Sequence, residues 1–159
     1  MKRFLVFVCF LALFSSCEED IRLNNPSMQA LKDNVFWRAV NTTASVQTDG
    51  SLLIEGQTKD EVFQLKTEET ALQSYALGNG DANNVSYKIT APQGQFVYET
   101  GSNASSGQIT ITEFDKVAKT VSGTFQCRVS SDSGSPLVGN TVVFREGVFY
   151  KIPIKVATP

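Results

Sequence analysis

Apolar and polar residues alternate along most of the chain from Val35 onward, and this period of two predicts β-strands. The clearest case is the stretch VSGTFQCRV, where two sets of side chains take opposite faces. One set is Val121, Phe125, Cys127 and Val129, and the other is Ser122, Thr124, Gln126 and Arg128. Strict alternation of this kind indicates one buried face and one wet face, as in antiparallel sheets. We therefore expect Cys127 to be a small core residue rather than a reactive thiol.

The last apolar stretch shows the same alternation. One face would carry Val148, Tyr150, Ile152, Ile154 and Val156, and the other Phe149, Lys151, Pro153 and Lys155. A proline has no N–H to donate to a sheet. The strand should therefore lie at an edge, or leave the sheet, at Pro153.

Asp49-Gly50 lies between two apolar runs and predicts a hairpin. A two-residue type I′ turn favours this pair, because both turn residues need positive φ. That turn would place Val46 opposite Leu53 and Gln47 opposite Leu52.

Further short strands are expected between turns rich in Gly, Asn, Asp and Ser. They cover residues 36–41, 62–67, 74–78, 85–90, 95–99, 108–114 and 141–145. About ten short strands, with no long helical period and no internal repeat, predict an all-β domain over residues 35–159. The expected fold is an antiparallel β-sandwich or flattened β-barrel.

The N-terminus has the pattern of a signal peptide over residues 1–16. A short basic start precedes an apolar run from Phe4 to Phe14, and Ser15 and Ser16 supply the small residues before a cleavage site. The run is shorter than the roughly 20 residues of a spanning helix. Residues 17–34 are polar, and they are expected to form a flexible stalk with one helical turn around Met28 to Lys32.

Cys17 directly follows this run. LFSSC resembles the lipobox of bacterial lipoproteins, although Phe14 stands where leucine is usual. The resemblance implies cleavage before Cys17 and lipidation of its thiol, since two or more acyl chains give stable anchoring. The alternative is an ordinary secretory cut with an incidental cysteine.

The next three residues are acidic. Glu18, Glu19 and Asp20 resemble the export signal of surface-exposed lipoproteins of Bacteroidota. The resemblance implies display at the cell surface rather than on the periplasmic face of the outer membrane. Three acids could also simply solvate a tether.

Composition removes several function classes. The net charge is −2 with no basic cluster, so nucleic acid is not an expected partner. The chain has no histidine, which excludes His-dependent nucleophiles and His-ligated metals. Its Asp and Glu residues are scattered, so paired-carboxylate catalysis is not expected either. We therefore predict no enzyme activity and no cofactor.

Two weaker patterns suggest ligands. Asn79, Asp81 and Asn83 have the spacing of oxygen ligands in a calcium loop. Thr90 stands where the bidentate Glu should be, and the same residue types favour any tight turn. Five aromatic residues could form a sugar-stacking platform or pack in the core: Trp37, Tyr75, Tyr87, Tyr98 and Tyr150.

Several segments occur together in a recognisable order: VFWRAV, DGSLLIEG, YALGNG, GQITITEFDKVAKTVSGTFQCRV and REGVFYKIPI. They resemble an uncharacterised family of short Bacteroidota lipoproteins with the pattern W-x-A, a D-G hairpin, I-T-x-x-D, V-S-G-T-F and G-x-F. The likeness covers most of residues 35–154. It implies a fold and a location, and no activity.

These patterns lead to one expected function. The chain should be a non-enzymatic lipoprotein that its N-terminal lipid holds at the outer membrane. It would act by binding or structural association with an unknown protein or glycan. The alternative is a β-sandwich module that binds a glycan or another small ligand.

Overall fold

The computed structural model describes residues 25–78, 82–101, 107–136 and 138–156. In these residues the chain forms eleven strands and no helix, which confirms the all-β prediction. The strands are β1 (Ser27–Lys32), β2 (Val35–Arg38), β3 (Asn41–Val46), β4 (Leu52–Gln57), β5 (Glu61–Thr67), β6 (Ser74–Ala76), β7 (Asn84–Ala91), β8 (Gly94–Glu99), β9 (Gly107–Asp115), β10 (Thr120–Ser135) and β11 (Gly139–Val156).

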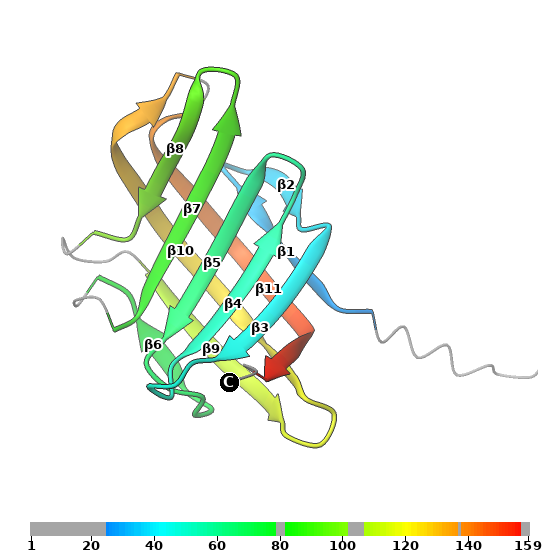
Figure 1. Cartoon of the computed structure of the whole chain (residues 1–159). Helices are drawn as coiled ribbons and strands as arrows, with labels where there is room; N and C mark the ends of the chain where they lie inside the picture. The colour runs from blue at the N-terminus through cyan, green and yellow to red at the C-terminus, as the bar shows by residue number, and fades with distance from the viewer. Residues whose placement is uncertain (1–24, 79–81, 102–106, 137, 157–159) are drawn as a thin grey trace, which may run out of the picture.

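The strands form two layers (Figure 1). The front layer has the order β3-β4-β5-β7-β8, and the back layer has the order β2-β1-β11-β10-β9-β6. The C-terminal end of β11 pairs with β3, and β10 pairs with β8 at Ser130 and Glu99. These two contacts join the layers into a flattened barrel. The β11–β3 pairing is parallel, so the sheet is mixed rather than wholly antiparallel.

β11 changes its partner along its length. It pairs with β1 as far as Tyr150 and with β3 from Ile154 onward. Pro153, which has no N–H to donate, lies between these two partners. β11 stays in the sheet at this point, because Pro153 pairs with Thr120 of β10, so the prediction that the strand lies at an edge or leaves the sheet there is wrong.

The predicted alternation in β11 is wrong for its middle part. The buried residues are Val142 and Phe144, then Gly147 and Phe149, then Ile152. Glu146 and Lys151 have positive φ of 51° and 46°, and the pairing with β10 shifts register nearby. Each irregularity adds one residue and exchanges the two faces. Val148 and Tyr150 consequently point outward with 38% and 40% of their surface exposed.

The VSGTFQCRV stretch follows the predicted faces with one exception. Val121, Phe125, Cys127 and Val129 are buried, as expected. Ser122 is buried too, because a register shift toward β9 falls between Ser122 and Gly123. Its Oγ donates to Glu113 Oε2 at 3.0 Å and accepts from the Lys151 N–H at 3.1 Å.

Two glycines and two phenylalanines interlock across β10 and β11. Gly123 pairs with Phe149, and Phe125 pairs with Gly147. A Cβ on Gly123 would lie 2.4 Å from the Phe149 ring, and a Cβ on Gly147 would lie 2.6 Å from the Phe125 ring. Each ring therefore covers the glycine of the opposite strand, a known way to protect a glycine in a sheet.

The Asp49-Gly50 hairpin forms with a different register from the predicted one. Val46 pairs with Leu52, and Ser45 pairs with Leu53. The Gly50 N–H donates to the Gln47 carbonyl at 3.1 Å, and only Gly50 in this turn has positive φ. This is the three-residue loop that ends in a glycine bulge, rather than a type I′ turn. It places Leu52 and Ile54 in the core.

The predicted stalk is shorter at its C-terminal end, and the predicted helical turn is wrong. Residues 27–32 form strand β1, and Met28 is fully buried. Asp33 and Asn34 have positive φ and turn the chain into β2. The single strand predicted over residues 36–41 is divided between β2 and the start of β3.

Aromatic side chains fill the space between the layers. Phe63 lies at the centre, with its ring centroid 4.4 Å from that of Phe144 and 5.1 Å from that of Phe125. Trp37 packs on Phe63 from the β1–β2 hairpin at 5.6 Å. In the described part of the chain, aromatic rings thus pack the space between the layers.

The Gly123→Ala variant should test the interlock. Its Cβ would also lie 2.1 Å from the Thr110 carbonyl oxygen, so the backbone must shift. We expect the free energy of unfolding to fall by about 2–3 kcal/mol, measured by urea denaturation. Thr124→Ala, at the neighbouring outward position, should change it by about 0.5 kcal/mol or less. Equal effects of the two changes would contradict the interlock.

Candidate functional site

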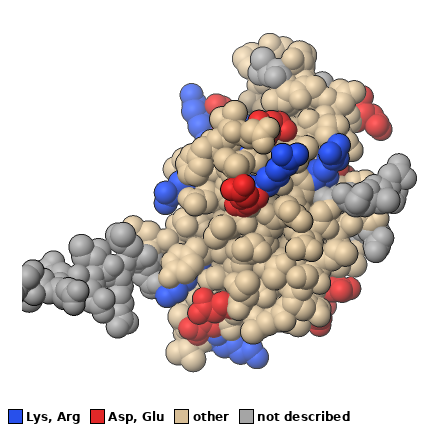
Figure 2. Space-filling model, turned by 180° about the vertical axis from the view of Figure 1, so that it is seen from behind, with Lys and Arg blue, Asp and Glu red and all other residues tan. Residues whose placement is uncertain are grey.

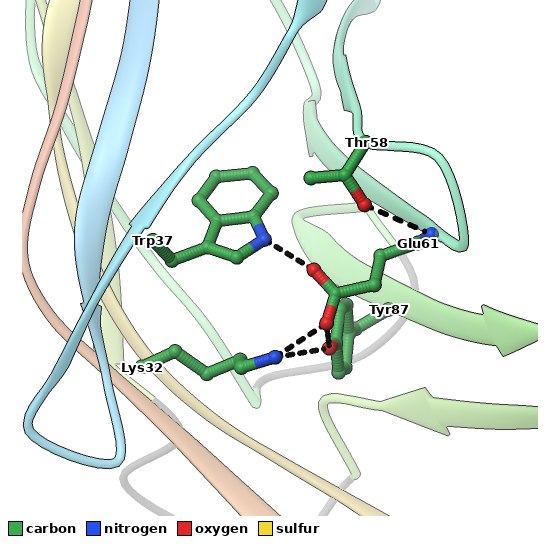
Figure 3. A network of polar contacts seen from close by, with 5 residues as sticks. All are labelled: Lys32, Trp37, Thr58, Glu61 and Tyr87. Carbon is green, nitrogen blue, oxygen red and sulfur yellow. Dashed lines mark hydrogen bonds and ion pairs between the residues drawn. The ribbon is translucent and has the colours of Figure 1, made fainter.

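Four residues from four strands form a polar network at the edge of the core, here called the Glu61 network (Figure 3). Glu61 begins β5 and accepts hydrogen bonds from Lys32 Nζ, Trp37 Nε1 and, at 2.6 Å, Tyr87 Oη. Lys32 Nζ also donates to Tyr87 Oη at 3.0 Å. Lys32 ends β1, Trp37 lies in β2 and Tyr87 lies in β7. The network therefore fastens the β1–β2 hairpin to the front layer.

The network keeps its carboxylate ionised. Burial, the largest single influence, would by itself raise the pKa of Glu61. The hydrogen bonds from Lys32, Tyr87 and Trp37, together with the charge of Lys32, outweigh burial and hold this pKa below its usual value. Burial and the contact with Glu61 raise the pKa of Tyr87, so the phenol stays a neutral donor.

This arrangement is suited to holding structure rather than to proton transfer. A general base needs a pKa near the working pH and a free lone pair directed at substrate. Glu61 has a lowered pKa, and both of its oxygens accept hydrogen bonds from the protein. Only 17% of its side chain surface and 21% of that of Lys32 is exposed. We therefore interpret the network as structural.

The structure distinguishes between the two interpretations of the five aromatic residues, a sugar-stacking platform and packing in the core. Trp37, Tyr75, Tyr87 and Tyr98 are buried, and only Tyr150 is exposed. Packing in the core is confirmed for these four, and a sugar-stacking platform of all five residues is wrong. Tyr98 is held further by its Oη, which donates to the Gly139 carbonyl at 2.8 Å.

The candidate calcium loop lies mostly outside the described residues, because these exclude Asn79 and Asp81. Asn83 is described, and its Oδ1 accepts the backbone N–H of Glu68 at 2.8 Å. That bond joins the turn after β5 to the segment before β7. In the described part of the chain, no three His, Cys, Asp or Glu side chains are grouped so that they could hold a metal ion.

Cys127 is confirmed as a core residue. It is buried and free, and burial raises the pKa of its thiol, so it stays protonated. The other predicted site residues lie outside the described residues. They are Ser15 and Ser16, Cys17, and the acidic Glu18, Glu19 and Asp20.

A hollow of about 340 Å³ lies on the outer face of the front layer. It is lined by Asn41, Thr42, Thr43, Glu55, Gln57 and Lys155. Glu55 already accepts hydrogen bonds from the side chains of Gln57 and, at 2.7 Å, Gln64. The hydroxyl of Thr43 is buried and has no hydrogen-bond partner in the protein.

Three adjoining hollows lie along β10 and β11, with volumes of about 340, 210 and 130 Å³. The first two share Gln126, and the last two share Val143 and Arg145. We call them together the back groove. Its polar lining consists of amide groups, the guanidinium groups of Arg128 and Arg145, the Thr124 hydroxyl and the carboxylates of Asp33 and Glu146.

Sequence reasoning missed both the Glu61 network and the back groove. Lys32 and Glu61 are separated by 29 positions, and no local pattern connects them. Lys32 also lay in the segment interpreted as a stalk. The back groove depends on the register of β10 against β11, which includes irregularities that the alternation pattern does not reveal.

Comparisons with known proteins give one match. The model of a family described as a domain of unknown function, DUF6252, matches residues 24–153. No curated protein and no solved structure matches the chain. In the described part of the chain, no helix has the length and apolarity needed to cross a membrane.

Glu61→Gln should destabilise the protein by about 2 kcal/mol at pH 7, because Lys32 loses its counter-charge and a charge-assisted hydrogen bond. This loss of stability should become smaller at acidic pH. A carboxyl whose folded pKa is lowered contributes fully above its unfolded pKa, near 4.5, and the contribution disappears as pH falls through the folded pKa. Urea denaturation of both proteins at several pH values measures this.

Glu68→Gln is the matched control, since it removes the same charge from an exposed residue. This variant should change the free energy of unfolding at pH 7 by about 0.5 kcal/mol or less. The ionised network would be contradicted if the difference in the free energy of unfolding between wild type and Glu61→Gln stayed constant from pH 7 to below pH 4.5.

Proposed function

The chain belongs to the DUF6252 family, and we propose that it is an outer-membrane lipoprotein that acts by binding or structural association rather than by catalysis. The observation that carries the proposal is the position of Cys17. It follows the apolar run Phe4 to Phe14 and the small residues Ser15 and Ser16. A folded domain begins soon after it, with β1 at Ser27.

The geometry of the domain supports binding over chemistry. The space between the layers is filled by aromatic rings, and the Glu61 carboxylate is fully engaged by protein donors. Among the described residues, hollows lie on the outer faces of both layers. Contacts with a partner would therefore use the outside of the barrel.

We further propose that the anchored protein faces outward from a bacterium of the Bacteroidota. Glu18, Glu19 and Asp20 directly follow Cys17, where a surface-export signal is read. The resemblance of the motifs in residues 35–154 to short lipoproteins of that group supports the same origin. The two arguments are independent, since one rests on the leader and the other on the domain.

A ligand-binding module is the second candidate, and the back groove favours it. A module that binds sugars by aromatic stacking is not supported, because four of the five aromatic residues are buried. The amide and guanidinium groups along β10 and β11 instead offer hydrogen-bond donors to a polar ligand.

Cys17→Ser should abolish membrane attachment. The serine hydroxyl cannot form the thioether to the lipid, so most of the protein should move from the membrane to the soluble fraction. Fractionation of cells that express the full chain, with immunoblotting, measures this. Cys9→Ser is the control, because it changes a thiol inside the leader and should leave attachment unchanged. Attachment of Cys17→Ser at the wild-type level would overturn the lipid anchor.

Glu18→Gln, Glu19→Gln and Asp20→Asn together should reduce surface display and leave lipidation intact. The readout is the fraction of the protein that external protease digests on intact cells. We expect it to fall at least severalfold, while fractionation still finds the protein in the membrane. The control carries Asp60→Asn, Glu68→Gln and Asp132→Asn, which remove the same charge from exposed positions in the domain. Equal digestion of both variants would refute the address signal.

A further inference from the structure

The arginines of the described chain are all on one face. Arg38, Arg128 and Arg145 lie on β2, β10 and β11, and each points outward from the back layer. Lysines occur instead on both layers and in the turns. Figure 2 shows this face, with basic and acidic groups side by side in its upper part and near its lower edge, and a broad uncharged area at its centre. Arginine is the side chain suited to planar oxyanions, because its rigid fork donates two parallel hydrogen bonds.

Two of these arginines line the back groove. Arg128 pairs with Val143, so Arg145 is its diagonal neighbour on the same face of the sheet. Diagonal neighbours have Cβ atoms about 7–8 Å apart, and long side chains span that distance. Both guanidinium groups can therefore reach a single bound group, or two successive groups, along the groove.

Neither Arg128 nor Arg145 is held in a salt bridge in the described part of the chain. Arg145 makes a 3.5 Å contact with Asn34 Oδ1. Asp33, the acidic residue in the smallest hollow, accepts the Val143 N–H at 2.9 Å. Glu146 lines the first hollow, beside Gln108 and Gln126, and is exposed. The groove therefore carries two carboxylates as well as two guanidinium groups, but neither guanidinium group is fixed in an ion pair, so both can turn toward an external anion.

The rest of the groove suits hydroxyl groups. Gln108, Thr124 and Gln126 line the first hollow beside Val148. Amide and hydroxyl side chains both donate and accept hydrogen bonds, as a sugar hydroxyl does. Val148 offers an apolar surface on which the C–H face of a sugar ring can lie. The more exposed Val35 and Phe36 lie on β2 and are not among the residues that line the groove.

We propose that the back groove binds an extended glycan that carries carboxylate or sulfate groups. Arg128 and Arg145 bind the anionic groups, while Gln108, Thr124 and Gln126 bind the hydroxyls of the neighbouring sugar. The length of the groove along β10 and β11 favours a chain of sugars over a free ion. The proposal deepens the ligand-binding function above and does not depend on the lipid anchor.

The test measures binding of the purified full chain to four probes by calorimetry. They are a galacturonic acid tetrasaccharide, the matching neutral galactose tetrasaccharide, inorganic sulfate, and vesicles of phosphatidylcholine with phosphatidylglycerol. We expect saturable binding of the acidic tetrasaccharide and at least tenfold weaker binding of the neutral one. Sulfate should compete only at far higher concentration.

Variants connect binding to the groove. Arg128→Gln and Arg145→Gln should each raise Kd about tenfold or more, because each removes a charge-assisted hydrogen bond. Arg145→Lys keeps the charge and loses the fork, and it should also weaken binding. Lys59→Gln with Lys116→Gln is the control for two lost charges at exposed positions elsewhere. Thermal unfolding checks that every variant is folded.

Four results would overturn the proposal. They are no saturable binding of the acidic tetrasaccharide, equal binding of the neutral tetrasaccharide, and an unchanged Kd in the folded double variant Arg128→Gln, Arg145→Gln. Binding to the anionic vesicles alone would be the fourth, since it would assign the arginines to a lipid surface. Loss of membrane attachment in Cys17→Ser bears on none of these results, so the two proposals fail separately.

Discussion

The close approach of β10 and β11 is the constraint on which the rest of the structure depends. These two long strands belong to the back layer along most of their length, and at their ends they reach β8 and β3 of the front layer. Strands shared in this way must bend and twist, and the bend needs positions without side chains. Gly123 and Gly147 supply them, and Phe149 and Phe125 fill the space that the missing side chains leave. The V-S-G-T-F and G-x-F stretches of this chain are the two halves of this interlock.

The packed interior determines where function can lie. In the described part of the chain, aromatic rings fill the space between the layers, and the Glu61 network places an ion pair at the edge of the core. Lys32 and Trp37 bring the β1–β2 hairpin against the front layer there. A charged pair in this position costs desolvation, so its value lies in fixing where the hairpin docks. On the outer face of the back layer, the back groove combines amide, guanidinium and carboxylate groups on paired strands.

The sequence predicted features that follow from one strand alone. Alternation identified β10 and buried Cys127 correctly, whereas Pro153 indicated an edge and instead lies at a change of partner within the sheet. Features that depend on the pairing of two strands were not predicted from the sequence. The bulges at Glu146 and Lys151 exchange the faces of β11, and neither residue type signals positive φ. β1 was missed because only Met28 and Ala30 of its residues are buried, and its other apolar residue, Leu31, faces outward. The Arg128 and Arg145 pair emerges only once the β10–β11 register is known.

The place of β1 in the fold has a mechanical consequence. If the chain is tethered through its N-terminus, any drag on the domain reaches it first at Ser27, the start of β1. That strand lies between β11 and β2, and its bonds to β11 extend from Ser27 to Lys32. Tension along the strand would stress these bonds in shear, all together, rather than peel them apart one by one. The Lys32 contact with Glu61 lies at the far end of the same strand and would resist its sliding. The domain would thus be built to keep its shape under pull from the side on which it is held.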